Sequence, residues 1–322
     1  MTRNNPILYI VIPCYNEEQV LPHTNPMFVG KIEELVESQE IHPQSKVMYV
    51  NDGSKDKTWE IIQEYASSNP YVVGISQSRN RGHQSSVLAG MYEAAEFADI
   101  VITIDADGQD DINCMDQMIA EYKTGSEIVY GVRDNRDTDS AFKRITAEGF
   151  YKVMQVFGAD VVFNHADYRL VSKRFIHELA KFKEVNLFLR GIMPLVGFKY
   201  SFVTYKRHER IAGESHYPLS KMLGLAIDGI TSLSIKPIRL ITSLGVMTSL
   251  FSFLLIIWVL WSKFSGTVVA GWASTYAIVS LLGGVQLISL GVIGEYIGKI
   301  YLETKQRPRY IISDRTYDEN ND

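Results

Sequence analysis

Cysteine is scarce in this chain, and there is no excess of positive charge. Only two of the 322 residues are cysteines, Cys14 and Cys114, and they lack the spacing of a CxxC or metal-binding motif. This argues against a disulfide framework and fits a reducing compartment. The formal net charge of −5 gives no support for a nucleic-acid-binding protein. The sequence also lacks internal repeats, low-complexity segments and a charged-then-apolar signal peptide, so we expect its N-terminal part to stay in the cytosol.

Charged side chains are almost missing from one long region near the C-terminus. Residues 240–294 contain a single one, Lys263, whereas residues 1–235 have the composition of a globular domain. The uncharged runs on either side of Lys263 are each long enough to cross a bilayer, which takes about 20 apolar residues. The pattern predicts two transmembrane helices, at about 238–262 and 270–298. The alternative is a helical hairpin buried in the core of a soluble protein.

The flanks of these two segments predict their orientation. Tryptophans lie near the connecting loop, as in an interfacial aromatic belt, and basic residues lie at the outer ends. The residues concerned are Trp258, Trp261 and Trp272 near the loop, Lys236 and Arg239 before the first segment, and Lys299, Lys305, Arg307 and Arg309 after the second. The positive-inside rule then predicts a multi-pass protein of the cytoplasmic membrane, with the globular part and both chain ends in the cytoplasm.

The globular part is organised around a strand that ends in two carboxylates. Residues 100–104 are apolar without alternation, which predicts a strand buried on both faces, and Asp105 and Asp107 follow it. Side chains in this position lie at the carboxyl edge of an open α/β sheet, where ligands bind. Their oxygens suit Mg²⁺ or Mn²⁺ together with substrate phosphates. The alternative is that both residues only cap a turn or the following helix.

Strand and helix patterns alternate through the first 131 residues. This alternation favours an α/β fold with a doubly wound, mostly parallel sheet and right-handed crossovers. The predicted strands are 7–12, 46–51, 71–76, 100–104 and 127–131, and the predicted helices include one from about Thr58, one at 87–97 and one at 113–123.

Polar side chains follow the other strands as well. Asn16 is a candidate N-cap for the helix after the first strand. Asp52 follows the second strand, either as a functional group or as a turn residue. Residues 78–86 form a basic turn before a helix N-terminus, which is either a phosphate neighbourhood or a solvated turn.

Beyond Asp134 the alternation stops. The pattern of residues 141–158 predicts an amphipathic helix with basic residues. The pattern of residues 218–235 predicts either a helix that lies in the membrane interface or an ordinary core helix. Further elements are predicted at 173–182, a helix, and at 200–205, a strand. We therefore expect a globular domain at 1–217, an interfacial helix at 218–237, a two-helix transmembrane region at 238–298 and a cytosolic tail at 299–322.

Taken in order, these motifs resemble those of the family 2 glycosyltransferases, which have the Rossmann-like GT-A fold. The similarity is to the polyprenyl-phosphate branch, which includes bactoprenol glucosyltransferases and dolichyl-phosphate mannosyltransferases. The match spans nearly the whole chain, and the ordered set is far more specific than any single motif. The matching stretches are 12–17, 50–54, 78–82, 105–110, 167–170 and 210–215.

The resemblance implies a nucleotide-diphosphate sugar donor, a polyprenyl-phosphate acceptor and a divalent ion, Mg²⁺ or Mn²⁺. The residues that it assigns to the nucleotide sugar are Pro13, Tyr15, Asn16, Glu17, Asp52, Arg79, Gly82, Asp105, Ala106, Arg207 and Arg210. It assigns the metal to Asp105, Asp107 and Gln109, the acceptor phosphate to Arg133, Lys143 and Arg144, and catalytic roles to Asp107 and Asp167. His165-Ala166 and His83 depart from the family pattern and leave the sugar open.

The reaction implied is an inverting transfer, with UDP-glucose as the first expectation for the donor and undecaprenyl phosphate for the acceptor. It would supply a lipid-linked sugar for modification of cell-envelope glycans. By analogy with phosphoserine, the acceptor phosphate has a second pKa near 6 and is mostly a dianion at neutral pH. We therefore expect Asp167 to orient a substrate more than to act as a strong base.

Several alternatives stay open at this point. The sugar can instead be an N-acetylhexosamine, galactose, mannose or aminoarabinose. A processive polysaccharide synthase would carry a Gln-x-x-Arg-Trp motif and more transmembrane helices, and the chain has neither. A catalytically silent membrane scaffold would have lost the Asp-x-Asp or the loop arginines, and both are present.

The resemblance also suggests that the protein forms a homo-oligomer, since bactoprenol glucosyltransferases suggest a tetramer. Glycines in the predicted membrane helices would permit close contact between chains. The alternative is that the two helices of one chain pack on each other.

Overall fold

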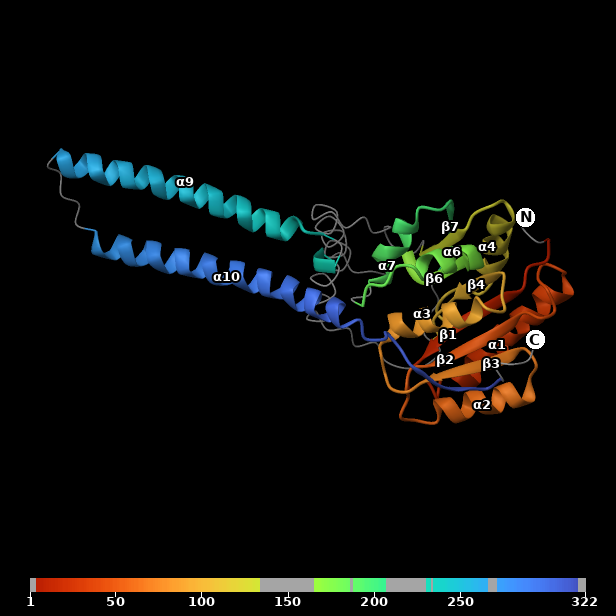
Figure 1. Cartoon of the computed structure of the whole chain (residues 1–322). Coiled ribbons are helices and arrows are strands. Elements are labelled where there is room, and N and C mark those ends of the chain that lie inside the picture. Colours follow the sequence, from red (N-terminus) through yellow and green to blue (C-terminus); the bar gives the residue numbers. More distant parts are fainter. Residues whose placement is uncertain are drawn as a thin grey trace.

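The chain folds into an α/β domain from which a hairpin of two long helices projects (Figure 1). The computed structural model describes residues 4–133, 165–185, 188–206, 230–232, 234–265 and 271–317. The helix predicted at 141–158 lies outside this part of the chain, as does most of the segment predicted at 218–235.

A single eight-stranded sheet forms the centre of the domain, in the order β7-β5-β6-β4-β1-β2-β3-β8. Strands β1 to β5 and β7 run in one direction, and β6 and β8 run antiparallel to their neighbours. The predicted mostly parallel α/β sheet is therefore confirmed. The strands are β1 (Leu8–Cys14), β2 (Lys46–Asn51), β3 (Val72–Gln77), β4 (Ile100–Thr103), β5 (Ile128–Arg133), β6 (His165–Ser172), β7 (Tyr200–Tyr205) and β8 (Ile312–Arg315).

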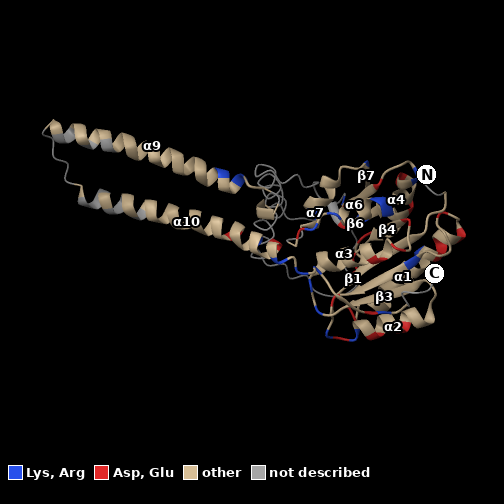
Figure 2. Cartoon of the chain, viewed as in Figure 1, with Lys and Arg blue, Asp and Glu red and all other residues tan. Residues whose placement is uncertain are grey.

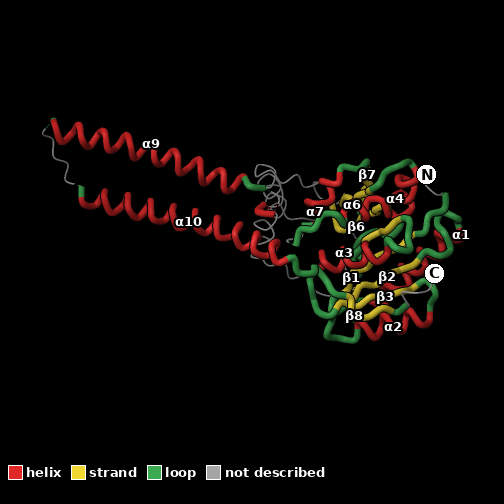
Figure 3. Tube along the Cα trace, viewed as in Figure 1, coloured by secondary structure: helices red, strands yellow, loops and turns green. Residues whose placement is uncertain are grey.

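Helices cover both faces of the sheet, which explains why its central strands are apolar on both sides (Figure 3). On β1, Ile10 belongs to one buried cluster, together with Phe28 of α1, whereas Val11 belongs to the other, together with Leu88 of α3. The helices of the domain are α1 (Leu21–Glu37), α2 (Thr58–Ser68), α3 (His83–Ala94), α4 (Cys114–Lys123), α6 (Lys173–Leu179) and α7 (Leu189–Ile192), followed by the 3₁₀ helix Met193–Val196.

One local prediction is wrong. Asn16 does not cap the first helix, because α1 begins at Leu21 and Val20 is its N-cap residue. Asn16 has instead a left-handed backbone with φ of 56°. Its side chain accepts a hydrogen bond from Lys55 N, in the loop after β2, so that this Asn joins two loops rather than starting a helix.

The C-terminal segment returns to the domain and adds an edge strand to the sheet. Sequence patterns predicted a tail here, whereas β8 pairs antiparallel with β3, with Ser76 opposite Asp314. Beyond the strand, Thr316 exchanges two hydrogen bonds with the backbone of Gly74, at 2.8 and 3.0 Å. The strand is short and polar, and its pairing depends on a partner about 240 residues earlier, so no local pattern indicates it.

The projecting hairpin consists of α9 (Lys236–Phe264) and α10 (Trp272–Lys305). By length and composition, Lys236–Leu255 and Leu281–Lys305 are candidate membrane spans, and none of either window is buried in protein. The structure therefore does not bury these two windows in the globular domain, in contrast to what the alternative interpretation expected. Figure 2 shows that the charged residues described in the hairpin lie at its domain end. Tyr296 OH bonds to Ser234 O and Lys299 Nζ to Ser232 Oγ at 3.2 Å, which joins the two arms at that end.

Two helix-interior glycines provide a test of how closely α3 packs on the sheet. A Cβ atom at Gly90 would lie 2.3 Å from a methyl carbon of Val11 and 2.7 Å from one of Val50, whereas nothing lies within 4 Å of a Cβ at Gly30 in α1. Overpacking costs about 1–3 kcal/mol, and replacing Gly by Ala in a helix gains about 1 kcal/mol. We expect Gly90→Ala to lower the melting temperature of the full chain in detergent, and the matched Gly30→Ala to leave it unchanged or raise it. Equal shifts in both variants would contradict this packing.

Candidate active site

Four neighbouring parallel strands bring polar side chains to one edge of the sheet. β1, β2, β3 and β4 all end there, and the antiparallel strand β6 begins there, with Arg169 opposite Thr103. The residues that follow or open these strands include most of those selected from the sequence: Pro13, Tyr15, Asn16, Glu17, Asp52, Arg79, Gly82, Asp105, Ala106, Asp107, Gln109 and Asp167. This is the carboxyl edge, where open α/β sheets bind their ligands.

The loops after β1 and β2 hold each other in place through backbone groups. Asn16 N donates to Ser54 Oγ at 3.0 Å, and Glu17 N donates to Thr58 Oγ1 at 2.8 Å. The side chain of Tyr15, the residue before them, is exposed. Because the loops after β1 and β2 are hydrogen-bonded to each other, together they form one ordered wall of the site at this edge of the sheet.

Asp52 organises the turn between β3 and α3. Its two carboxylate oxygens accept hydrogen bonds from Arg81 N at 2.8 Å and Gly82 N at 2.9 Å, and its side chain is buried. Gly53 has φ of 62°, and a Cβ there would lie 2.5 Å from the Arg79 carbonyl carbon, so the β2 loop and this turn touch directly. Asp52 therefore shapes a neighbouring turn rather than only its own, and its role toward the nucleotide stays a prediction. Arg79 and Gly82 lie on the turn that it shapes, and the Arg79 side chain is exposed.

The stretch after β4 is a tight turn of acidic and polar residues. Gly108 has φ of 67°, and Gln109 N donates to Asp107 Oδ1 at 3.1 Å. Ala106 and Gln109 are buried, whereas 36% of the Asp105 side chain is exposed. Burial raises the pKa of Asp105 to about 6 against the opposing charge of His83, and the neighbouring carboxylates of Asp167, Asp110 and Asp107 add to the rise.

Asp167 lies in a group of cations that comes from three separate elements. Its carboxylate pairs with Arg169 on β6 and with Arg190 on α7, the latter at 3.0 and 3.3 Å. His83, the first residue of α3, lies 3.4 Å from Asp167 and 3.8 Å from Asp105. Burial alone would raise the pKa of Asp167, but His83, Arg169 and Arg190 together hold it well below its usual range. Asp167 is therefore ionised at neutral pH.

His83 lies within 4 Å of both Asp105 and Asp167. Burial would lower the pKa of His83, but its contacts with Asp167 and Asp105 outweigh this and raise the pKa above its usual value. The sequence marked His83 only as a departure from the family pattern. Arg190 was missed altogether, because α7 is a four-residue helix whose contact with Asp167 spans 23 positions of the chain.

Arg133, at the end of β5, forms a second ion pair. Its guanidinium bonds to Asp110 Oδ1 at 3.2 Å and to Tyr205 OH at 3.2 Å, and Tyr205 OH also donates to Asp110 Oδ1 at 2.6 Å. Asp110 and Tyr205 are therefore parts of the site edge that the site assignment from sequence did not include. Lys143, Arg144, Arg207 and Arg210 lie outside the residues that the structure describes.

The donor set suits a metal ion that shares its ligands with a substrate. Among the residues that the structure describes, no group of three or more His, Cys, Asp or Glu side chains is arranged to hold a metal by itself. Mg²⁺ is usually held by one or two carboxylates together with substrate phosphates and water. Asp105 and Asp107 provide two such carboxylates on one turn, and the carboxylates of Asp110 and Asp167 lie near enough to interact with Asp105.

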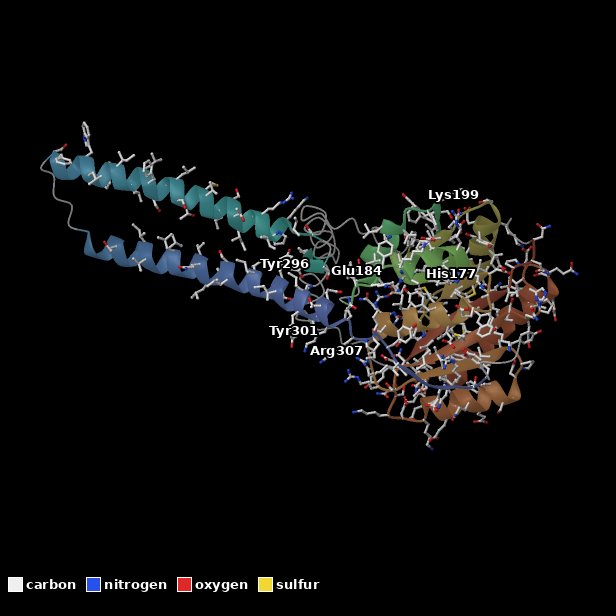
Figure 4. All side chains as sticks on the ribbon, in the orientation of Figure 1. His177, Glu184, Lys199, Tyr296, Tyr301 and Arg307 are labelled. Atoms are coloured by element: carbon white, nitrogen blue, oxygen red, sulfur yellow. The ribbon has the colours of Figure 1, made fainter. Side chains whose placement is uncertain are left out.

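The site edge is connected to the domain end of the hairpin. Ser78 N, in the turn after β3, donates to Ile311 O at 2.9 Å, six residues beyond α10. Val185 N donates to Glu303 of α10 at 2.8 Å, and Arg309 bonds to Phe182 O. Figure 4 labels Glu184 and Arg307 in this junction, close to Tyr296 and Tyr301 of α10. The edge of the sheet that carries the carboxylates is therefore attached to the domain end of the two apolar helices, which we call the foot of the hairpin.

Comparison with known proteins gives a consistent result over nearly the full length. A sequence model of glycosyl transferase family 2 matches residues 9–180, and a model of the GtrB C-terminal hairpin matches residues 236–300. The chain is 46% identical over 319 residues to glycosyltransferase YkoT of Bacillus subtilis, covering 99% of this chain and 95% of that protein. It is 39% identical over 309 residues to the bactoprenol glucosyl transferase of Shigella phage SfX, covering 95% of this chain and 98% of that protein.

Among solved structures, the mannosyltransferase PcManGT from Pyrobaculum calidifontis, in complex with GDP-Man and Mn²⁺, is similar with a TM-score of 0.43 and 14% identity, over 92% of this chain and 85% of that one. The family model covers more than half of the chain, and the relatives match its whole length. The chain therefore belongs to glycosyl transferase family 2, and its two long helices form the GtrB C-terminal hairpin.

Proposed function

We propose that this glycosyltransferase moves a hexosyl residue, with glucose as the first candidate, from a UDP-sugar to a polyprenyl phosphate such as undecaprenyl phosphate at the cytosolic face of the membrane. The observation that carries the proposal is the attachment of the carboxylate edge to the foot of an apolar hairpin. An acceptor with its phosphate at headgroup level and its tail in the bilayer reaches a site in that position. The 39% identical relative acts on bactoprenol according to its name, which supports the same acceptor class.

The donor would lie along the carboxyl edge, against the loops after β1, β2 and β3. Pro13, Tyr15, Asn16, Glu17 and Asp52 belong to the part of the wall that we assign to the nucleoside. Arg79, Gly82, Asp105, Ala106, Arg207 and Arg210 complete the assignment to the nucleotide sugar. A Mg²⁺ or Mn²⁺ ion bound to Asp105 and Asp107, with Gln109 beside them, would offset the charge that grows on the departing diphosphate.

Asp167 would act by position rather than as a proton acceptor. A carboxylate whose pKa is held well below its usual range is a weak base, and the acceptor phosphate is already mostly a dianion at neutral pH. A single displacement by that phosphate on an α-linked donor gives a β-linked product. Arg133, Lys143 and Arg144 remain our assignment for the acceptor phosphate, together with the residue argued for in the next subsection.

We also propose that the globular domain and both chain ends lie in the cytoplasm. β8 follows the hairpin and is hydrogen-bonded to β3, which precedes it. If α9 and α10 each cross the bilayer, the two strands must share one compartment, and the basic flanks favour the cytoplasmic side. The proposed order of parts is that of the sequence prediction, with the segment 299–322 now contributing β8. Self-association through the apolar helices, as a tetramer, is part of this proposal because their large side chains are exposed in the single chain.

Two alternatives differ in what they predict. Transfer of N-acetylhexosamine, galactose, mannose or aminoarabinose would keep the lipid product and change the donor. A catalytically silent membrane scaffold would bind these ligands and yield no product. The intact set of Asp105, Asp107 and Asp167 favours the enzyme over the scaffold.

Transfer can be measured directly. Membranes that contain the protein, incubated with undecaprenyl phosphate, a divalent ion and a panel of radiolabelled nucleotide sugars, should place label in the lipid phase from one donor. Chelation should abolish the labelling, and Asp107→Asn should reduce it by about 100-fold or more because the ion loses a charged ligand. The matched control Asp314→Asn changes an exposed carboxylate on β8 and should keep full activity. Ligand binding without label from any donor would favour the scaffold.

The role of Asp167 can be separated from that of Asp107 by pH. At raised pH we expect Asp107→Asn to cost far more activity per folded molecule than Asp167→Asn. The rate should rise with pH through about 6, as the acceptor phosphate loses its second proton, and this limb should remain in Asp167→Asn. The variant should also melt earlier, since fully buried Arg169 loses its counter-charge, a change that costs about 3–5 kcal/mol in buried pairs. Equal, pH-independent losses of activity in Asp107→Asn and Asp167→Asn would contradict this separation of roles.

The orientation of the hairpin can be tested by cysteine labelling. The two native cysteines are buried, so Ser265→Cys at the hairpin tip and Asp314→Cys on β8 supply single exposed thiols. A membrane-impermeant maleimide should label Ser265→Cys in intact cells and Asp314→Cys only after lysis. Labelling of both before lysis, or of neither, would be inconsistent with two spans and a cytoplasmic domain.

A further inference from the structure

An attacking phosphate dianion meets a strongly acidic site, so it needs a cation that it can reach. Asp105, Asp107, Asp110 and Asp167 all lie at the edge where the donor's anomeric carbon would be held. Among the described residues, three cationic groups contact Asp167: His83, Arg169 and Arg190. Arg133 is a fourth cation at this edge, and it is paired with Asp110.

The three groups around Asp167 differ in exposure. Arg169 is 0% exposed, and its Nη1 lies against Met193 Sδ, so it balances the charge of Asp167 from inside the protein. Arg190 is 37% exposed and His83 is 42% exposed. His83 lies between Asp167 and Asp105, which places it on the side of the donor carboxylates. Arg190 reaches Asp167 from a different element, α7.

The position of α7 relates Arg190 to the membrane. Leu189 N donates to Gln84 Oε1 in the first turn of α3 at 2.7 Å, which fixes α7 beside the site. The segment just before α7 is fastened to the foot of α10 by the Val185–Glu303 bond and by the contact of Arg309 with Phe182. α7, which carries Arg190, therefore lies on the side of the domain that is nearest to the hairpin (Figure 1).

We propose that Arg190 binds the phosphate of the lipid acceptor and presents it beside Asp167. A guanidinium can hold two oxygens of a phosphate in one plane, as it holds the two oxygens of Asp167 through Nε and Nη2. When Arg190 turns to the phosphate, Arg169 remains paired with Asp167. The carboxylate therefore still has a counter-ion. A phosphate oxygen then attacks the anomeric carbon, and the bond to the diphosphate breaks with its electron pair leaving on the nucleotide.

This inference rests on the proposed function, and binding can be measured without turnover. The full chain in detergent micelles is titrated with farnesyl phosphate as the lipid probe and, separately, with UDP. The variants are Arg190→Gln and Arg190→Lys, with Arg174→Gln as the matched control, because Arg174 is an exposed arginine on α6 that pairs with Glu127. We expect Arg190→Gln to weaken farnesyl phosphate binding by about 10- to 100-fold, which corresponds to the loss of a charge-assisted contact. UDP binding should stay within twofold, and Arg190→Lys should recover part of the loss.

The outcomes separate this inference from its alternatives. Farnesol, which lacks the phosphate, and inorganic phosphate should each compete poorly in the wild type; strong competition by inorganic phosphate would indicate a free-anion site instead. Unchanged farnesyl phosphate binding in Arg190→Gln would overturn the proposal. Equal loss of UDP and lipid binding would assign Arg190 a structural role and overturn it as well. A wild type that binds the lipid and transfers no sugar would refute the proposed transferase function while leaving the assignment of Arg190 to be judged by the binding ratios.

Discussion

The mutual repulsion of carboxylates at one edge of the sheet is the constraint on which the site depends. Asp167 belongs to β6, whereas Asp105, Asp107 and Asp110 follow β4, and all four bring negative charge to one partly buried edge. Basic side chains pair with most of these carboxylates. Arg169 and Arg190 pair with Asp167, Arg133 pairs with Asp110, and His83 lies near both Asp167 and Asp105. At Asp105, burial raises the pKa to about 6, and the neighbouring carboxylates of Asp167, Asp110 and Asp107 add to the rise despite His83. The divalent ion that we propose, bound together with the diphosphate, would bring positive charge to Asp105.

The same constraint explains why two carboxylates so close together serve different purposes. Asp167 is surrounded by cations, so its pKa lies well below the usual range, whereas Asp105 faces other acids. Opposite environments in one site are a common way to separate the roles of like groups. Asp105 is suited to a metal ion and Asp167 to holding guanidinium groups and, through them, an anionic substrate.

A second constraint is the attachment of the apolar hairpin to the edge of the sheet that carries the carboxylates. The chain leaves α10, passes the turn after β3 with the Ser78–Ile311 bond, and pairs as β8 along β3. Arg315 and Tyr317 then bond to Glu93 on α3, the helix that begins with His83. The helix and turn that frame the site therefore receive contacts from the segment that follows the hairpin. This attachment would bring the proposed lipid acceptor and soluble donor to the same edge.

Much of this architecture was determined by the sequence itself. Five apolar runs, the polar residues that follow them and two long uncharged segments predicted the sheet, the carboxylate edge and the hairpin, because burial on both faces of a strand and crossing of a bilayer both leave local patterns. Only the tertiary structure decided the partners of those residues. Positions 23 to about 240 residues apart are joined by the pairing of β8 with β3, the Arg190–Asp167 ion pair, the Arg133–Asp110–Tyr205 contact and the turn-shaping bonds of Asp52. Such contacts leave no periodic trace, since each is made by single side chains that meet only once the strands are in register.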